Sequence, residues 1–505
     1  MSNPLFDHLF VPHAERAAPF ITVPGGRDIS YAEFLRQAAR YAHAIAACGV
    51  RAGDRVAVQV DKSPEALMLY AACVQSGAVF LPLNTAYTAT ELSYFIEDSG
   101  AALVICDRTR RENATNAVGR AGARIETLNA DGSGTISVLA QSMPATFETV
   151  HRTGDDLAAL LYTSGTTGRS KGAMLTQTNL LSNAQVLTWE WRFTSDDVLL
   201  HALPIFHTHG LFVATHVMLA CGGRMIFMPK FDPEALLSSL AEASVLMGVP
   251  TFYTRLLAEP QFNHDACAHM RLFISGSAPL LSETHNAFEA RTGHRILERY
   301  GMTETNMNTS NPYEGERRAG TVGLPLDGIE LRVTNGEAGT PVADGEVGQI
   351  EVRGPNVFRG YWQMPDKTAA ELRDNGFFIT GDLGMIDAQG YVHILGRDKD
   401  LIISGGYNIY PKEIEQVLDA HPSVLESAVI GVPHADFGET VLGVLVLQPG
   451  PAIDLEDVMA SVRTALARFK HPRQLVIVEA LPRNAMGKVQ KNMLRDQFGD
   501  MFVMA

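Results

Sequence analysis

Hydrophobic and polar residues follow two rhythms from Tyr31 to about Phe231, and both rhythms recur as far as Ser275. Some stretches have apolar residues three or four positions apart, which predicts helices, and the short apolar runs between them predict buried strands. The expected helices include 33–47, 63–75, 90–98 and 233–243, and the expected strands include 55–60, 79–82, 103–106, 199–203, 225–228, 245–248 and 271–275. Strands that alternate with helices are typical of βαβ units and parallel sheets. This part of the chain is therefore predicted to have an α/β fold.

The pattern changes in the last third of the chain. From about residue 322 to 396 the apolar runs become short and alternating, with Gly or Asp turns between them, which favours antiparallel strands. After Arg397 helical and strand patterns return, with helices expected at 411–419 and 455–467 and strands at 424–431, 441–447 and 474–478. We predict a multi-domain α/β protein with a large N-terminal domain, 1–397, that contains a β-rich subdomain at about 322–396. A small α/β C-terminal domain, 398–505, is expected to follow.

Composition and charge narrow the class of protein. The 505 residues are too many for one hydrophobic core, and 46% hydrophobic with 19% charged residues is typical of globular proteins. The formal charge of −15 argues against nucleic acid or an anionic membrane as a partner. The longest uncharged stretch, 66–90, is interrupted by Gly77 and Pro82, which argues against a bilayer span. Five scattered cysteines without CxxC spacing, and an N-terminus without a basic segment, predict a cytoplasmic protein.

A glycine-rich segment carries the first candidate chemistry. Residues 162–172 read Tyr-Thr-Ser-Gly-Thr-Thr-Gly-Arg-Ser-Lys-Gly and follow the apolar run 157–161. Glycines that expose backbone N–H groups, several hydroxyls and one lysine suit a polyphosphate. The segment is not a Walker A loop, because Ser170 stands where the second glycine of that pattern would be. A flexible Ser/Gly linker is the alternative, but linkers seldom combine hydroxyls and a lysine in this order after a strand.

The order of residues in this loop resembles the phosphate-binding signature of the acyl-adenylate-forming superfamily, which includes acyl-CoA synthetases, peptide-synthetase adenylation domains and luciferases. Further segments follow in the order of that family: Phe-His-Thr-His-Gly at 206–210, Gly-Ser-Ala-Pro at 276–279, Tyr-Gly-Met-Thr-Glu at 300–304, Thr-Gly-Asp at 380–382, Gly-Arg-Asp-Lys-Asp at 396–400 and Pro-Arg-Asn-Ala-Met-Gly-Lys at 482–488. The resemblance spans nearly the whole chain. It implies activation of a carboxylic acid by ATP and Mg²⁺ to an acyl-AMP, and then transfer of the acyl group to the thiol of coenzyme A.

The resemblance also implies roles for individual residues. The residues expected at the nucleotide are Thr163, Ser164, Gly165, Thr166, Thr167, Gly168, Lys171, Gly276, Ser277, Ala278, Pro279, Glu298, Arg299, Tyr300, Gly301, Met302, Thr303, Asp382, Arg397 and Lys488. Thr303 and Glu304 would contact the α-phosphate and hold Mg²⁺, with Thr163 also on the metal side. Asp382 and Arg397 would bind the ribose, and residues 276–279 and 298–300 would line the adenine base. On composition alone, Lys488 would be a solvated lysine near the C-terminus. The resemblance implies instead that it stabilises the charge that develops during attack on the α-phosphorus.

Members of the family rotate their C-terminal domain between the two half-reactions. The corresponding hinge residue is Lys399, and Gly405 and Gly406 would then line the channel for the thiol, where glycine lets a narrow ligand pass close to the backbone. The rotation would remove Lys488 from the site. Acetylation of Lys488, by a lysine acetyltransferase with a matching deacetylase, would remove its charge.

The acid pocket is expected around 248–257, where Arg255 stands in an otherwise apolar segment. A buried arginine needs a charged partner, and a second carboxylate on the substrate would supply one. A protein acid such as Glu259, or capping of the helix, is the alternative on residue chemistry alone. The stretches 201–212, 247–253 and 297–313 are also similar to bacterial malonyl-CoA synthetases, which implies that Arg255 holds the distal carboxylate.

The same resemblance places other side chains around the acid. Ser277 would lie near the distal carboxylate, and Thr208, Met302 and Met307 would shape the space around C2 of the diacid. His207 would act at the mouth of the pocket, while His209 is expected to be structural. The pair His207 and His209 could suggest zinc, but no third ligand follows at a zinc-like spacing.

The sequence thus predicts an ATP- and Mg²⁺-dependent malonate:CoA ligase that also accepts methylmalonate, with malonate or methylmalonate, ATP and coenzyme A as its partners. A ligase for another short or aryl carboxylic acid remains an alternative within the same fold. So does a stand-alone adenylation enzyme. A scaffold without catalysis is disfavoured because Lys171, Thr303, Glu304, Asp382 and Lys488 are all present.

Overall fold

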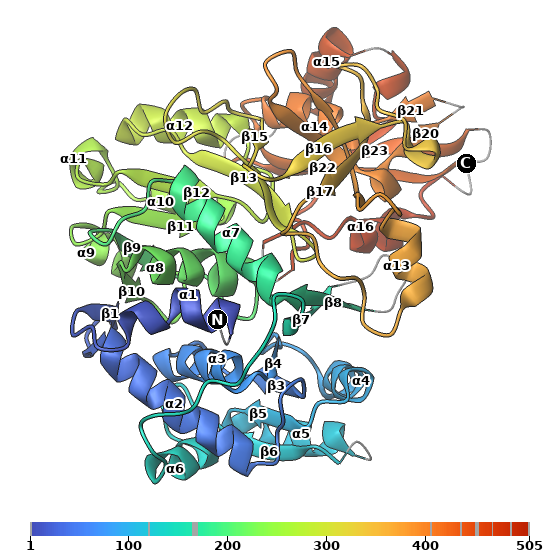
Figure 1. The fold of residues 1–505 in the computed structure, drawn as a ribbon. Helices are drawn as coiled ribbons and strands as arrows, with labels where there is room; N and C mark the ends of the chain where they lie inside the picture. Colours follow the sequence, from blue (N-terminus) through green and yellow to red (C-terminus); the bar gives the residue numbers. More distant parts are fainter. Residues whose placement is uncertain are drawn as a thin grey trace.

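The fold is described from a computed structural model over residues 3–119, 122–163, 170–404, 407–434, 437–449, 454–466, 468–484 and 487–502. These residues form four β-sheets with helices packed between and around them. Figure 1 shows the N-terminal elements, in blue, at one end of the molecule and the C-terminal elements, in orange and red, at the other. No helix in the described ranges is both long and apolar enough to cross a bilayer.

The first sheet has six strands in the order β6-β5-β3-β4-β7-β8. Its strands are β3 (Arg55–Gln59), β4 (Val79–Pro82), β5 (Leu103–Cys106), β6 (Arg124–Thr127), β7 (Leu157–Thr163) and β8 (Lys171–Thr176), and its helices are α2 (Tyr31–Ala47), α3 (Pro64–Ser76), α4 (Ala89–Ser99), α5 (Arg111–Val118) and α6 (Thr135–Gln141). Val56 and Val58 pack on one face with α2 and α3, while Ala57 between them packs on the other face with α4 and α5. Parallel strands covered on both faces are buried throughout, which explains their continuous apolar runs.

The second sheet has nine strands in the order β15-β14-β13-β12-β11-β9-β10-β1-β2. The strands are β1 (Pro19–Thr22), β2 (Asp28–Ser30), β9 (Val198–His201), β10 (Arg224–Phe227), β11 (Val245–Gly248), β12 (Leu272–Ser275), β13 (Leu297–Met302), β14 (Asn306–Ser310) and β15 (Leu324–Pro325). The helices that accompany them are α1 (Pro4–Leu9), α7 (Gln177–Glu190), α8 (Thr215–Cys221), α9 (Pro233–Leu240), α10 (Pro250–Leu257), α11 (His264–Cys267) and α12 (Ser282–Thr292). Strands β10, β9, β11, β12 and β13 are parallel, so their carboxyl ends meet at one edge.

The third sheet confirms the antiparallel unit predicted in the last third of the chain. Strands β16 (Glu330–Thr334), β17 (Gly348–Arg353), β18 (Phe378–Ile386) and β19 (Val392–Arg397) pair antiparallel in sequence order. One short helix, α13 (Pro365–Glu371), lies in the connection between β17 and β18. This connection also crosses to the first sheet, where residues 359–362 run beside β8.

The C-terminal region forms a fourth sheet, in the order β21-β20-β23-β22 with β24 on β23. Its strands are β20 (Ile402–Ser404), β21 (Tyr407–Ile409), β22 (Val424–His434), β23 (Gly438–Leu447) and β24 (Gln474–Ile477), and its helices are α14 (Pro411–Asp419), α15 (Leu455–Ala465) and α16 (Lys491–Phe498). Alternate side chains of β22 and β23 enter two separate cores, one with α14 and α15 and one with α16. An independent domain needs a hydrophobic core of its own, and the C-terminal region has two. The domain boundary at residues 397–398 stays a prediction.

Candidate active site

The candidate residues gather at the carboxyl edge of the second sheet. The loop after β9 carries His207, Thr208 and His209, the loop after β12 carries 276–279, and β13 ends in the segment 300–304. Ligands of α/β sheets bind outside the carboxyl ends of the strands, so this edge is the expected place for a site. The loop after β9 is held from behind by Lys62, which donates to the carbonyl of His201 over 2.7 Å, and by His201 Nε2, which lies 2.9 Å from the carbonyl of Gly210.

One end of the site is formed by a tyrosine, an aspartate and an arginine from three strands. Asp382 on β18 stands opposite Arg397 on β19, and Arg397 Nε lies 2.7 Å from Asp382 Oδ1. The hydroxyl of Tyr300, at the end of β13, donates to the other carboxylate oxygen of Asp382. The negative charge of Asp382 raises the pKa of Arg397, which keeps the guanidinium charged. The structure thus brings together the residues expected at the ribose, and their contact with a ribose stays a prediction.

Glu298 lies one strand position before Arg299, on the opposite face of β13. Burial raises the pKa of Glu298 to about 8, and its Oε1 accepts a hydrogen bond from the backbone N–H of Leu280 over 3.1 Å. A carboxyl with this pKa is mostly protonated at neutral pH and can donate one hydrogen bond. Glu298 therefore joins β13 to the loop after β12, which is where the nucleotide base is expected.

Glu304 supplies the carboxylate expected at the metal. It is 5% exposed, and burial raises its pKa, while the charge of Lys171 lowers it. No group of three or more His, Cys, Asp or Glu side chains within the described ranges could hold a metal ion. Mg²⁺ commonly binds through one or two carboxylates together with phosphate oxygens and water, so a single buried carboxylate beside a phosphate site fits it. Thr303 precedes Glu304 in the turn after β13 and is half-buried.

The hairpin of β7 and β8 frames the expected phosphate loop. Thr163 is the last residue of β7 and Lys171 is the first residue of β8, and the two stand opposite each other. Lys171 Nζ lies 3.3 Å from Glu371 Oε1 and 4.2 Å from the ring centre of Tyr361. The loop residues Ser164, Gly165, Thr166, Thr167 and Gly168 lie outside the described residues, so their predicted contacts with the phosphates stay predictions. Gly405 and Gly406, expected in the thiol channel, lie outside the described residues as well.

A cluster of buried polar atoms without partners marks the other end of the site. Within the described residues no hydrogen-bond partner is present for His207 Nδ1, Thr208 Oγ1, His209 Nε2, Ser275 Oγ, Arg299 Nε and Arg299 Nη2. Buried polar atoms are nearly always paired, so such a cluster indicates a place that a polar ligand or water fills. Burial lowers the pKa of His207 to about 4 and the pKa of His209 well below its usual value, and the charge of Arg299 lowers both further. Both histidines are therefore neutral at pH 7.

Arg299 is the cation of this cluster. It is 3% exposed, and burial lowers its pKa to about 9, which leaves it charged at neutral pH. No ion pair joins it to an acid in the described part of the chain, and its Nε and Nη2 have no hydrogen-bond partner there. A Cβ atom at Gly276 would lie 2.4 Å from Arg299 Cζ, so only glycine at the end of β12 leaves room for the guanidinium. Arg299 is expected at the nucleotide, and the structure places it, buried, beside His207 and His209.

The prediction that Arg255, in α10, is buried is wrong. Its side chain is exposed, because Phe252, Tyr253 and Leu256 form the apolar face of the helix and Arg255 falls on the opposite side. Thr251, four positions earlier, shares that side, and a Cβ atom at Gly487 would lie 3.5 Å from Thr251 Oγ1. Arg255 thus lies on the helix side that carries the contact with the C-terminal turn at Gly487. Its predicted contact with the substrate stays a prediction, but burial no longer argues for it.

The alternation of side chains along β13 could have shown, from the sequence alone, that Arg299 lies on the opposite face of the strand from Tyr300. Successive side chains of a strand point to opposite faces, so Glu298 and Tyr300 share one face and Arg299 shares the other with Gly301. Met307 on β14 stands opposite Gly301 and is 2% exposed, and Met302 is half-buried at the end of β13. Two of the residues expected around C2 of the acid are therefore close to the strand that carries Arg299.

Ser277 lies between the two ends of the site. Its φ of +71° falls in the left-handed region, where a residue other than glycine is strained. Its hydroxyl lies 3.2 Å from His209 Nδ1. The strained backbone therefore places Ser277 against the histidine loop, and its neighbours Ala278 and Pro279 continue toward the base site.

Lys488 reaches the site from the C-terminal domain. It follows Gly487 in a tight turn in which the Lys488 N–H donates to Asn484 Oδ1 over 3.0 Å. Desolvation, with the nearby charge of Arg397, lowers the pKa of Lys488 to about 8, although the residue is exposed. Lys399, the expected hinge, lies in a short turn between Arg397 and Asp400. The C-terminal domain thus sits with Lys488 turned toward the residues expected at the ribose.

Comparison with known proteins agrees with this architecture. The family model described as AMP-binding enzyme matches residues 11–362, and that of the AMP-binding enzyme C-terminal domain matches residues 413–488. ATP-bound MatB from Rhodopseudomonas palustris is 56% identical, with a TM-score of 0.98 over 99% of this chain and 100% of that chain, and its apo form gives 0.86. A feruloyl-CoA synthase of Amycolatopsis sp. is 37% identical over 94% of this chain and 95% of its own. A malonate–CoA ligase of Arabidopsis thaliana is 36% identical over 88% of this chain and 78% of its own.

Proposed function

Because the chain belongs to the AMP-binding enzyme family, we propose that it is an AMP-forming ligase that joins malonate to coenzyme A. In the first half-reaction a malonate carboxylate oxygen attacks the α-phosphorus of ATP, giving malonyl-AMP and pyrophosphate. In the second, the thiolate of coenzyme A attacks the acyl carbon and AMP leaves. One carboxylate reacts, and the other remains to be recognised.

The single observation that carries malonate is the buried guanidinium of Arg299, whose Nε and Nη2 have no hydrogen-bond partner among the described residues. A charged arginine that has lost its water and has no acid partner destabilises the free pocket. A dicarboxylic acid supplies the missing negative charge and two acceptors in the fork geometry that arginine favours. A monocarboxylic acid that presents its one carboxylate to the nucleotide leaves the guanidinium unpaired. The hydroxyls of Thr208 and Ser275, also without partners, are further donors in the same cluster.

The other end of the site suits the nucleotide. Asp382, paired with Arg397, accepts hydrogen bonds from ribose hydroxyls, and Glu304 with Thr303 faces the α-phosphate and would hold Mg²⁺, which shields the phosphate charge when bound. Lys488 directs its ammonium toward the reacting carboxylate and α-phosphate and stabilises the negative charge that develops there. His207, neutral at pH 7, closes the pocket between the two ends without adding charge.

The second half-reaction needs a different arrangement of the C-terminal domain. We infer that this domain turns at Lys399, which withdraws Lys488 and brings Gly405 and Gly406 to the channel for the thiol. The chain superposes better on ATP-bound MatB than on its apo form, which supports the view that the present arrangement is the one for adenylation. Acetylation of Lys488 would then stop the first half-reaction only.

Methylmalonate is the second proposed substrate. Met302 ends the strand that carries Arg299 and Met307 lies on the neighbouring strand, and flexible thioether side chains adapt to one extra methyl group. One methyl changes discrimination by only about 1–3 kcal/mol, so methylmalonate is expected to react more slowly or with a higher KM than malonate.

Malonate-dependent release of pyrophosphate, measured with and without coenzyme A, tests the proposal. Malonate is expected to give much higher kcat/KM than acetate, benzoate or ferulate, and malonyl-CoA is expected only when coenzyme A is present. Equal efficiency with acetate would show that the pocket does not read a second carboxylate. Preference for ferulate, the acid in the name of the Amycolatopsis relative, would assign the site to aryl acids instead.

A further inference from the structure

The segment 359–362 forms an extra edge beside β8. The N–H of Trp362 donates to the carbonyl of Gly172 over 2.7 Å, and the N–H of Met174 donates to the carbonyl of Gly360 over 3.0 Å. Tyr361 stands opposite Ala173 in this pairing. Lys171 and Ala173 are two positions apart and share one face of β8, so Tyr361 is fixed next to the lysine that begins the strand after the phosphate loop.

Lys171 is held by an acid from the third sheet's connecting helix. Its Nζ lies 3.3 Å and 3.4 Å from the two carboxylate oxygens of Glu371, the last residue of α13. Only 12% of the Lys171 side chain and 22% of the Glu371 side chain are exposed, so water screens this pair less than a surface pair. The aromatic ring of Tyr361, 4.2 Å from the ammonium, adds a cation–π contact. The ammonium is thus fixed on two sides.

The hydroxyl of Tyr361 joins Glu371 to Glu304. It donates to Glu371 Oε2 over 2.6 Å and also lies within hydrogen-bond distance of Glu304 Oε1, at 3.1 Å. A phenol has one proton, so the two carboxylates share one donor. The backbone carbonyl of Glu304 is held as well, because it accepts the N–H of Phe358 over 2.8 Å. Lys171, expected at the phosphates, and Glu304, expected at the metal, are therefore linked by two further side chains. These are Glu371 and Tyr361, neither of which the sequence motifs include.

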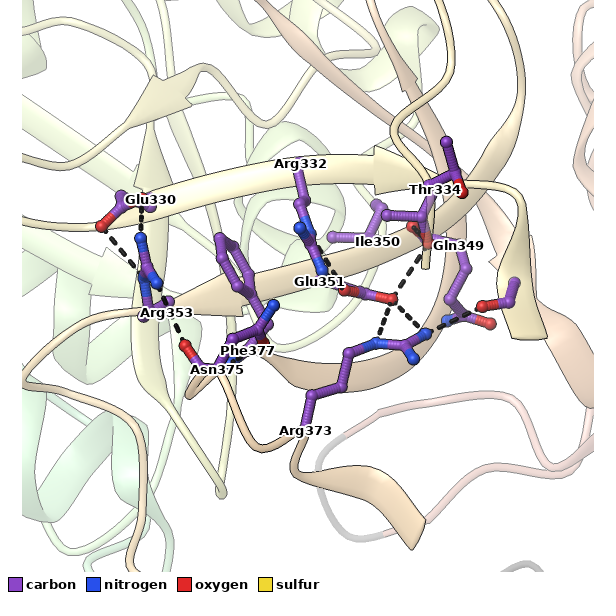
Figure 2. Close-up of polar contacts among 12 residues, drawn as sticks. Glu330, Arg332, Thr334, Gln349, Ile350, Glu351, Arg353, Arg373, Asn375 and Phe377 are labelled. Carbon is purple, nitrogen blue, oxygen red and sulfur yellow. Dashed lines mark hydrogen bonds and ion pairs between the residues drawn. The ribbon is translucent and has the colours of Figure 1, made fainter. Parts of the chain in front are cut away.

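The position of Glu371 is itself set by a buried ion pair. Figure 2 shows Glu351 between Arg332 and Arg373, and Arg373 follows Glu371 by two residues. Glu351 is fully buried, and Arg373 Nε donates to its Oε1 over 2.8 Å. The middle of α13 is tied to Tyr361, whose N–H donates to Thr368 Oγ1 over 2.9 Å. The helix is thus anchored at its centre and just beyond its C-terminal end.

We propose that Glu371 and Tyr361 are positioning residues for the adenylation half-reaction. Glu371 and the ring of Tyr361 place the Lys171 ammonium at the mouth of the phosphate loop, and the Tyr361 hydroxyl orients the Glu304 carboxylate. The inference rests on the proposed function, because that function gives Lys171 and Glu304 their ligands. Misplacement by about 1 Å of a group that contacts a reacting phosphate can cost about 100-fold in rate.

Glu371→Gln tests the first role, since it keeps the size of the side chain and removes its charge. At saturating malonate and MgATP we expect the rate of malonyl-AMP formation to fall about 10- to 100-fold. The KM for malonate and the rate of thioester formation from supplied malonyl-AMP should stay within about twofold of the wild type, because Lys171 acts at the phosphates only. Tyr361→Phe should raise the Mg²⁺ concentration that gives half-maximal adenylation, since the ring stays and the hydroxyl is lost.

Lys367→Ala is the matched control. Lys367 Nζ lies 2.7 Å from Glu371 Oε1 on the outer side of α13. This variant therefore removes one of the cations that pair with Glu371 and leaves Lys171 in place. Its adenylation rate is expected to match the wild type. The proposal is overturned if Lys367→Ala and Glu371→Gln lose activity equally, if both half-reactions of Glu371→Gln slow together, or if Glu371→Gln binds MgATP more tightly and reacts at the normal rate. The last result would make Glu371 a competitor for Lys171.

Calorimetric titration of MgATP separates this inference from the proposed function. An enzyme that does not activate malonate can still bind MgATP. If the wild type shows no malonate-dependent pyrophosphate release, weaker binding of MgATP by Glu371→Gln, but not by Lys367→Ala, still supports the positioning role. Unchanged affinity in both variants, in an enzyme without malonate activation, would refute the role as well.

Discussion

Replacement of Arg299 by methionine separates a recognition role from a structural role, because the two roles predict opposite effects. Methionine is apolar, flexible and close in length, so it fills the space of the arginine stem without the charge. Arg299 is 3% exposed, and its Nε and Nη2 have no hydrogen-bond partner in the described residues. Burial lowers its pKa to about 9, so keeping the charged form in the free pocket costs several kcal/mol.

The second carboxylate of a bound diacid pairs with the Arg299 guanidinium and offsets the cost of its buried charge. Arg299→Met removes this favourable pairing from the complex with malonate. Removal of one partner of a buried, hydrogen-bonded charge pair costs about 2–5 kcal/mol, or roughly 30- to 5,000-fold in kcat/KM for malonate. Acetate has no distal carboxylate, so its kcat/KM should stay the same or rise. The midpoint of thermal unfolding should also stay the same or rise, because an unpaired buried charge is removed. The assay is pyrophosphate release with each acid at saturating MgATP.

Two results would refute this reasoning. A parallel loss of malonate and acetate activity, together with a lower unfolding midpoint, would make Arg299 part of the framework. An unchanged ratio of malonate to acetate efficiency would show that another group reads the second carboxylate. Arg299→Lys is the matched variant, since it keeps the charge without the fork and should recover part of the malonate preference.

Further predictions concern the nucleotide end and the cleft. Lys488→Ala should abolish malonyl-AMP formation and spare thioester formation from supplied malonyl-AMP; equal loss in both would contradict the domain rotation. Because the pKa of Lys488 is lowered to about 8, its ammonium is present below that pH and is lost above it, so kcat/KM for ATP should fall above about pH 8, and Lys488→Arg should move this fall to higher pH. Arg255→Ala should lower malonate activity more than acetate activity if Arg255 contacts the diacid, and equal effects would make it a surface residue. Asp382→Asn should raise the KM for ATP and leave that for malonate unchanged, as measured at saturating levels of the other substrate.

Most of the fold could be predicted from the sequence because its strands are short and buried. The apolar runs at 79–82, 103–106 and 245–248 are strands at those positions, since a strand covered on both faces needs every side chain to be apolar. The antiparallel sheet near the end of the N-terminal domain was predicted from its alternation. The pairing of 359–362 with β8 could not be predicted, because it joins residues nearly two hundred positions apart and has no apolar pattern of its own.

The site was predicted in part, for a related reason. Asp382, Arg397 and Tyr300 come together as the motifs suggest, since the middle of β18 at Asp382 pairs with the end of β19 at Arg397 and also accepts the hydrogen bond of the Tyr300 hydroxyl. The burial expected for Arg255 is wrong because the apolar face of its helix leaves that side chain exposed, and its contact with the acid stays a prediction. Arg299 is expected at the nucleotide together with its motif neighbours, and the twofold period of a strand places it on the opposite face from Tyr300. Glu371 and Tyr361 carry no motif, and only the fold shows their contact with Lys171.

The central claim is that the second carboxylate of the substrate pairs with the guanidinium of Arg299. A crystal structure of the enzyme with malonate and a non-hydrolysable ATP analogue tests it most directly. We predict both oxygens of one malonate carboxylate within about 3 Å of the Arg299 nitrogens, with the other carboxylate facing the α-phosphorus. A malonate whose free carboxylate points to solvent or to Arg255, with Arg299 still unpaired, would contradict the account.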